Sequence, residues 1–304
     1  MELGGFKIAT VRGIPVRIHF TFLLVLPLLA WVFARSFREA ASMAGVPPEQ
    51  LSGAPFLWGL GLALALFFSV FLHELAHSLY AARTGARVRS ITLLMIGGVS
   101  QMEEMPKRPR HEALMAAFGP LVSLGIGALL YALVALVDIP SFNLQFALFY
   151  LALLNVVIGL FNLLPAFPMD GGRIMRAVLA PRLGLIRATR VAAAVGKAFA
   201  IGFAILGFLS FNMLLLLIAF FVYIGAQGET RSVVVDTLLG RLRVRDIMSA
   251  NVAVLPADAT AYDAAERMLR EKRTAFAVVD GGAPLGMVTL EAVRAVPAEA
   301  RGRT

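Results

Sequence analysis

Residues 56–82 read FLWGLGLALALFFSVFLHELAHSLYAA, an apolar run long enough to span a bilayer. Near its end lies an H-E-x-x-H pattern, His73-Glu74-x-x-His77. Residues four apart share one face of a helix, so the two imidazoles can bind one metal ion. Glu74 directly follows His73 in this helix, so its carboxylate can take a proton from a metal-bound water. Ionisable residues inside a span are costly and are functional candidates by default, so we prefer this interpretation to a pair of packing histidines.

The composition predicts an integral membrane protein. The chain has 304 residues, of which 59% are hydrophobic and 15% are charged, whereas soluble proteins carry about 25% charged residues. It has no cysteine, so a metal must be held by His, Asp or Glu. The net charge of +9 does not indicate a nucleic-acid partner, because many Lys and Arg residues lie between apolar segments and form no compact basic module.

Six transmembrane helices are predicted. Four apolar runs, at about residues 18–34, 56–82, 113–137 and 144–164, each fit one span. The run 191–226 is too long for one span, and Ser210-Phe211-Asn212 near its middle indicates a turn between two helices. A basic arm precedes the first run, as in a signal peptide. That run is longer than a typical signal core, so we expect a retained helix, with residues 6–16 of the arm pairing as a short strand.

The distribution of positive charge predicts the topology. Loops after the second and fourth spans are rich in arginine, including Arg173 and Arg176, whereas residues 138–143 and the turn near 210 have no Lys or Arg. The positive-inside rule then places both termini in the cytoplasm. The H-E-x-x-H pattern would lie about 9 Å of helix from the cytoplasmic end of its span, at Arg83, and within reach of water.

Residues 90–101, SITLLMIGGVSQ, predict β structure, because they are β-rich, broken by Gly97-Gly98 and too short for a span. Two arrangements fit this segment. It can be a hairpin at the membrane edge, where an unpaired strand can accept an extended peptide by strand addition. It can equally be a plain cytoplasmic hairpin.

A third metal ligand is expected where the fourth span ends. A catalytic zinc normally has three protein ligands. Residues 162–172 read NLLPAFPMDGG, in which two prolines break the helix and two glycines allow a sharp reversal. Asp170 is therefore expected on unwound backbone, close in depth to the histidine pair. An Asp-Gly pair is often only a turn, but beside the H-E-x-x-H pattern we take Asp170 as a ligand.

These motifs together resemble the site-2 protease family of intramembrane zinc metalloproteases. The likeness covers about residues 5–228 and rests on four features: the H-E-x-x-H pattern, the segment from Asn162 to Gly171, the Gly97-Gly98 hairpin and Phe118-Gly119-Pro120.

The resemblance implies one zinc ion per chain, held by His73, His77 and Asp170, with Glu74 as the general base. It implies that Asn162 contacts the substrate or the oxyanion, and we add Gly97 and Gly98 to the candidate substrate-binding residues. The alternative for Asn162 is a hydrogen bond between helices. Asn155 matches no motif, so we expect it to serve packing.

From Arg243 the composition becomes that of a soluble domain. A strand near 253–256, a helix at 261–271 and strands at 275–279 and 285–289 are predicted. This order resembles a single CBS motif, an adenosine-nucleotide-binding module found in one branch of the site-2 proteases. We therefore expect three parts: a protease domain (1–228), a linker (229–242) and a CBS-like motif (243–304).

A half-module of this size has a thin core, so we expect it to pair across a homodimer. Binding of an adenine nucleotide is less well supported. Thr289 matches the CBS pattern, but the usual ribose-binding acid falls at Ala292, and Glu291 is one place off register.

The fold class predicted is a polytopic α-helical membrane protein with a membrane-associated β-hairpin and a small α/β CBS-like module. The predicted function is a zinc endopeptidase of the cell membrane that cuts in or near the transmembrane segment of a single-span protein. The resemblance implies regulated signalling, with a substrate of the anti-sigma or pro-sigma type. The alternative is a CBS-regulated metal-ion carrier, which would have no particular need for Glu74.

Overall fold

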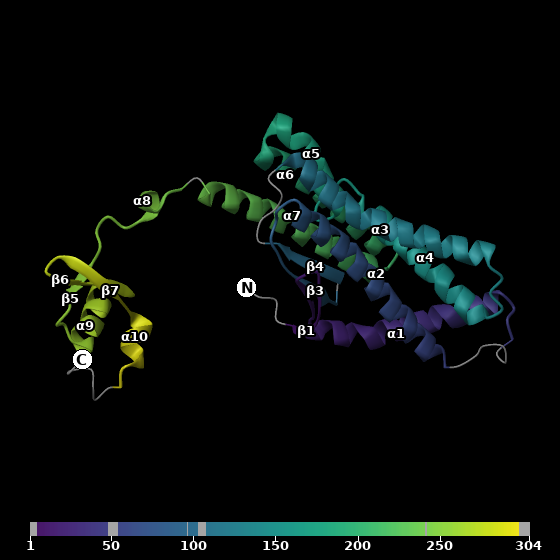
Figure 1. The fold of residues 1–304 in the computed structure, drawn as a ribbon, viewed down its shortest axis with the longest axis horizontal. Coiled ribbons are helices and arrows are strands. Elements are labelled where there is room, and N and C mark those ends of the chain that lie inside the picture. The colour runs from purple at the N-terminus through teal and green to yellow at the C-terminus, as the bar shows by residue number, and fades with distance from the viewer. Residues whose placement is uncertain (1–4, 48–53, 96, 103–107, 241, 298–304) are drawn as a thin grey trace. The chain divides into compact units, whose positions relative to one another are not determined.

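The computed structural model describes residues 5–47, 54–95, 97–102, 108–240 and 242–297 (Figure 1). The chain forms two compact units, Met1–Thr237 and Leu238–Thr304. Among the described residues, six helices are long and apolar enough to cross a membrane, which agrees with the predicted number of spans. They are α1 (Phe20–Met43), α2 (Pro55–Arg83), α3 (Pro109–Leu136), α4 (Phe142–Asn162), α6 (Leu185–Leu209) and α7 (Met213–Leu239).

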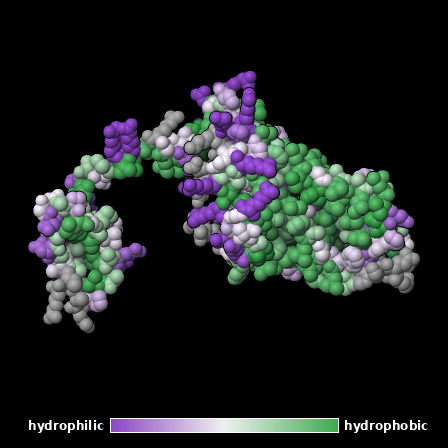
Figure 2. All heavy atoms as spheres, viewed as in Figure 1, coloured by the Kyte–Doolittle hydropathy of each residue, from purple (hydrophilic) through white to green (hydrophobic). Residues whose placement is uncertain are grey.

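One helix end differs from the predicted spans, and one turn falls where it was predicted. The α1 helix continues past residue 34 because Ala34, Phe37 and Ala41 recur at helical spacing and are buried. The turn between α6 and α7 falls at residues 210–212 as predicted, and the Asn212 side chain accepts a hydrogen bond from the N–H of Leu215. Figure 2 shows hydrophobic residues over much of the visible helical surface, with hydrophilic residues gathered near α5 and the sheet.

The first unit also holds a four-stranded sheet in the order β1-β2-β3-β4. Its strands are β1 (Phe6–Val11), β2 (Ile14–Ile18), β3 (Val88–Leu94) and β4 (Gly97–Met102). The β1–β2 and β3–β4 pairs are antiparallel, and β2 runs parallel to β3. The predicted hairpin is confirmed, although its Ile96 lies outside the described residues.

The N-terminal arm forms two strands rather than the one expected. Residues Arg12 and Gly13 both have positive φ, so they make a two-residue turn that lets the chain fold back on itself. The sheet is fixed to the helices by a buried cluster of Phe22 and Val25 from α1, Phe67 from α2 and Leu93 from β3. The result is that β3 and β4 lie against α2.

The chain between α4 and α5 (Asp170–Leu183) is the irregular segment that the prolines predicted. Within it, Ala166 and Phe167 are fully buried among residues of α6 and α7. The expectation that Asp170 lies on unwound backbone is wrong: the unwound residues are Leu163–Met169, and Asp170 begins α5. The sequence pattern did not predict α5, because this helix is short and mixes charged and apolar residues.

The second unit has the predicted order of elements. A sheet β5-β6-β7 is formed by β5 (Val254–Pro256), β6 (Ala275–Asp280) and β7 (Ala283–Thr289). Three helices accompany it: α8 (Val244–Ile247), α9 (Ala261–Glu271) and α10 (Leu290–Ala295). The core consists of Leu255, Ala264, Met268, Phe276 and Val293.

A capping box starts α9, in which hydrogen bonds from the Thr260 hydroxyl and backbone N–H lower the pKa of Asp263. The Thr289 hydroxyl, singled out in the CBS pattern, accepts a hydrogen bond from the N–H of Ala292 and so caps α10. Residues 229–239 of the expected linker are helical, because α7 runs to Leu239. The division into domains stays a prediction.

Candidate metal centre

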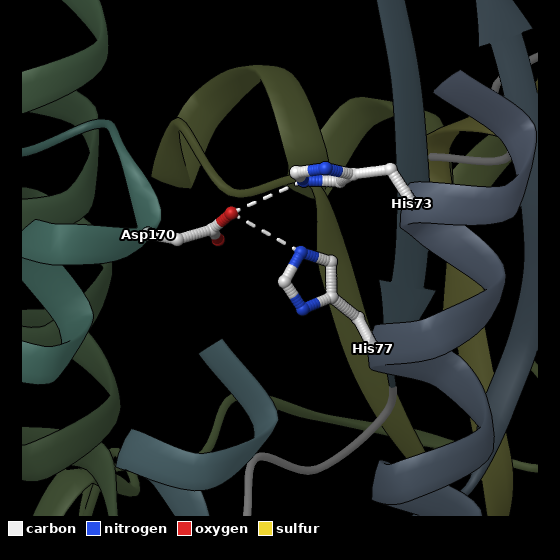
Figure 3. A group of neighbouring side chains, drawn as sticks. All are labelled: His73, His77 and Asp170. Carbon is white, nitrogen blue, oxygen red and sulfur yellow. Dashed lines mark hydrogen bonds and ion pairs between the residues drawn. The ribbon is translucent and has the colours of Figure 1, made fainter. Parts of the chain in front are cut away.

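The structure brings His73, His77 and Asp170 together (Figure 3). One ligand atom from each of the three lies within 4.8 Å of the other two. Oδ2 of Asp170 is 3.2 Å from Nε2 of His73 and 3.1 Å from Nε2 of His77. Two ligands of one tetrahedral zinc, with bonds of 2.0–2.1 Å, stand about 3.3 Å apart. The two distances from Asp170 thus match the spacing of ligands on one zinc ion.

The second nitrogen of each imidazole is held by α3. Nδ1 of His77 lies 2.6 Å from the carbonyl oxygen of Met115, and Nδ1 of His73 lies 2.9 Å from the Ser123 hydroxyl. A carbonyl only accepts, so Nδ1 of His77 carries a proton, and Nε2 is the ring nitrogen left to bind a metal. Nε2 faces Oδ2 of Asp170, so a cation bound there would contact both atoms.

Asp170 is present in the form that a metal ligand requires. Burial raises the pKa of its carboxyl, but hydrogen bonds to His73 and His77, with the charges of His77 and Arg173, outweigh burial and hold the pKa well below its usual range. The carboxylate is therefore ionised. Its position in space follows from the buried segment before it, whose Phe167 N–H donates to the carbonyl of Ala192.

Gly119 leaves room for the ligand atoms. A Cβ at this position of α3 would fall against Nε2 of His77 and within 2.7 Å of Nε2 of His73. The helix backbone therefore approaches the imidazoles as closely as only glycine allows. The set of one carboxylate and two imidazole donors fits a small cation, and the residues present fit zinc.

Glu74 and the hairpin lie beside this cluster. The carboxylate of Glu74 accepts a hydrogen bond of 2.7 Å from the Ser100 hydroxyl of β4. Gly98 packs directly on the same side chain, since a Cβ there would meet Cγ of Glu74. Gly97 and Gly98 start β4, so the structure places the predicted general base against the predicted hairpin.

Two asparagines differ in their surroundings. Asn162 ends α4 and donates to the carbonyl of Ile158 in its own helix, at 3.0 Å. Asn155 is fully buried and donates to the Ser69 hydroxyl of α2, at 3.2 Å. The second contact joins two helices, as expected of a packing residue.

A group of ion pairs surrounds α5, and the sequence pattern did not predict it. Arg176 donates to Glu112 of α3 at 2.6 Å, and Arg173 donates to Glu229 of α7 at 3.0 Å. We had expected both arginines to be topogenic loop charges, yet Arg176 is 3% exposed. These pairs hold α5, and with it Asp170, against α3 and α7. The signal in the sequence is the spacing of the two arginines, three and six residues after Asp170 on one helical face.

An H-E-x-x-H helix with a converging carboxylate, set in a bundle of membrane spans, defines a class of protein: a membrane-embedded metalloprotease. The sequence profile of Peptidase family M50 matches residues 61–142 and 138–209, and the CBS domain profile matches residues 244–299. The chain belongs to peptidase family M50, the site-2 protease family, and is a zinc metalloprotease.

Relatives across the family are similar to this chain over most of its length. It is 36% identical to zinc metalloprotease MJ0392 of Methanocaldococcus jannaschii, over 93% of this chain and 78% of the relative. It is 33% identical to putative zinc metalloprotease Rip3 of Mycobacterium tuberculosis, over 99% of this chain and 78% of the relative. The solved structure of a site-2 protease from M. jannaschii matches with a TM-score of 0.52 and 37% identity, over 75% of this chain and 96% of that one. These matches agree with a multi-pass membrane protein that carries a C-terminal CBS domain.

Proposed function

We propose that this protease hydrolyses a peptide bond in or near the transmembrane segment of another membrane protein. His73, His77 and Asp170 would hold the zinc ion, and Glu74 would act as the general base. The observation that carries this assignment is the convergence of three ligand atoms within 4.8 Å of one another, two of them from the helix that carries Glu74 and one from the start of α5.

The chain's own residues have distinct tasks in this reaction. When bound, zinc polarises the scissile carbonyl and makes a water molecule more acidic. Glu74 takes the proton from the attacking water and delivers it to the leaving amine. Asn162, at the end of α4, is the candidate donor to the developing oxyanion, because its amide has a second N–H besides the one that donates to the carbonyl of Ile158.

The substrate helix must unwind to expose a peptide bond, because its carbonyls are otherwise engaged in its own hydrogen bonds. Within the described part of the chain, β4 is an edge strand, and it borders Glu74. An unwound segment can pair with this edge beside Gly97 and Gly98. This arrangement would bring the substrate backbone to the general base.

The substrate we propose is a single-span membrane protein in a regulated pathway, of the anti-sigma or pro-sigma type. Similarity to stage IV sporulation protein FB of Bacillus subtilis supports such a role, since sporulation is a regulated programme. This relative is 33% identical over 150 residues, which make up 45% of this chain and half of the relative. The positive charge of the predicted loops supports a cytoplasmic location for both termini.

For the C-terminal CBS domain we propose dimerisation. One face of its sheet carries Val254, Ala277 and Met287 side by side across three strands, and Met287 is 69% exposed. The opposite face, with Leu255 and Phe276, packs on the module's own core. A second copy would cover the exposed row. Binding of an adenine nucleotide has less support, because Ala292 replaces the expected acid.

The test measures zinc content and cleavage of a model membrane-spanning substrate in detergent, for wild type and Glu74→Gln. We expect zinc in both proteins and cleavage by wild type alone, since the amide cannot accept the proton. Equal cleavage by both would refute the assignment of Glu74. Metal flux through liposomes without cleavage would support the carrier alternative, which no contact in the described residues favours.

A further inference from the structure

A chain of two hydroxyl groups leads from the buried side of α2 to the carboxylate of Glu74. The Ser78 hydroxyl of α2 donates to the Ser100 hydroxyl of β4 at 3.1 Å. The Ser100 hydroxyl lies 2.7 Å from Oε2 of Glu74 and 3.3 Å from the backbone carbonyl of the same residue. The shorter distance identifies the carboxylate as the main acceptor.

The order of donors in this chain is fixed. A hydroxyl has one proton, and an ionised carboxylate only accepts. Because Ser78 supplies the proton that Ser100 accepts, Ser100 is free to direct its own proton to Glu74. Ser78 is fully buried, so water does not compete for this contact.

Two residues on the same face of β4, Gly98 and Ser100, restrain the Glu74 side chain. Glu74 and Ser78 are four residues apart on α2 and flank Ser100. Two positions before Ser100 on β4, Gly98 packs against Cγ of Glu74. The aliphatic part and the carboxylate of Glu74 therefore both rest on the strand that borders the proposed substrate edge.

We propose that Ser100 is a positioning residue that orients Glu74 for proton transfer, with Ser78 holding Ser100 in turn. This inference rests on the proposed role of Glu74 as general base. The Ser100 hydroxyl faces α2 and is engaged there, so its task is to fix the base and not to bind substrate. A base held in one orientation reacts faster because the geometry is set before the substrate arrives.

The test compares Ser100→Ala, Ser100→Thr and Ser78→Ala with the matched control Ser90→Ala, in the full chain. The Ser90 hydroxyl lies on the same hairpin and contacts Gln101 at 3.3 Å, not Glu74. We expect Ser100→Ala to lower kcat about 10- to 100-fold, as loss of an outer-shell partner does, with KM and zinc content unchanged. Ser100→Thr keeps the hydroxyl and should recover most of kcat. Ser78→Ala should lower kcat less, and Ser90→Ala should match wild type.

A second readout needs no turnover. With glutamate labelled at the carboxyl carbon, the NMR resonance missing from Glu74→Gln identifies Glu74. It should move in Ser100→Ala and stay in place in Ser90→Ala. An unmoved resonance, a wild-type kcat in Ser100→Ala or a failure of Ser100→Thr to recover activity would each overturn the proposal. A failure of the protease assignment is recognised separately, because then Glu74→Gln cleaves as well as wild type.

Discussion

The absence of a side chain at residue 119 lets α3 approach the two histidines of the proposed metal centre. We predict that Gly119→Ala weakens zinc binding, because the new Cβ would meet the Nε2 atoms of both histidines. Overpacking of this kind costs about 1–3 kcal/mol. Zinc content after dialysis against a weak chelator measures the effect.

The matched control is Gly125→Ala on the same helix, where a Cβ would have nothing within 4 Å. This substitution should leave zinc binding intact and stabilise the helix by about 0.5–1 kcal/mol. Zinc retention by Gly119→Ala at the level of Gly125→Ala would show that α3 does not limit the site.

Single residues differ in how far the sequence alone predicts them. His73, Glu74 and His77 follow from a local spacing, and Asp170 from a proline-glycine segment with an expected depth. Ser100 and Arg176 act through partners on other elements, at distances along the chain that no local pattern encodes. Their functional contacts appear only when the helices are packed.

At the scale of elements, the position of α5 relative to α2 decides whether Asp170 reaches the two histidines, because α5 begins with Asp170. We predict that Arg176→Leu lowers the free energy of unfolding by about 3–5 kcal/mol, since it leaves the buried Glu112 without its partner. It should also lower zinc affinity by loosening α5. Unfolding in detergent and zinc titration measure the two effects.

Two further variants make this prediction specific. The double variant Arg176→Leu/Glu112→Leu removes both charges and should recover most of the lost stability. Arg35→Gln breaks the exposed pair with Glu39 and should have no measurable effect. A response of Arg176→Leu as small as that of Arg35→Gln would mean that the ion pair does not hold α5.

Elements were predicted unevenly, for physical reasons. The long spans and the Gly-broken hairpin have strong local signals in the sequence, so both were predicted correctly. The α5 helix is stabilised by contacts with α3, α6 and α7 rather than by its own apolar pattern, and the sequence showed only a loop. The extension of α1 to Met43 depends on burial of Phe37 and Ala41, which only the folded bundle provides.

At the scale of the whole molecule, the exposed row on the CBS sheet predicts the oligomeric state. We predict that Met287→Glu converts a dimer of the full chain to a monomer, because a charge would be buried in the shared face. Multi-angle light scattering of the purified protein in detergent measures this. Leu269→Glu is the control, since Leu269 is 80% exposed on α9 outside the sheet face. Identical masses for the two variants would refute dimerisation through this face.

The distance along the chain between the proposed metal ligands bears on how the enzyme is made. Asp170 follows His77 by 93 residues, so at about 5–20 residues per second the nascent chain carries the histidine pair for roughly 5–19 seconds without the carboxylate. The segment before Asp170 is then packed by α6 and α7, which are synthesised later still. We therefore expect a ribosome-bound intermediate to lack a complete set of the proposed ligands, and the newly made protease to stay inactive towards neighbouring membrane proteins until its last two spans have been inserted.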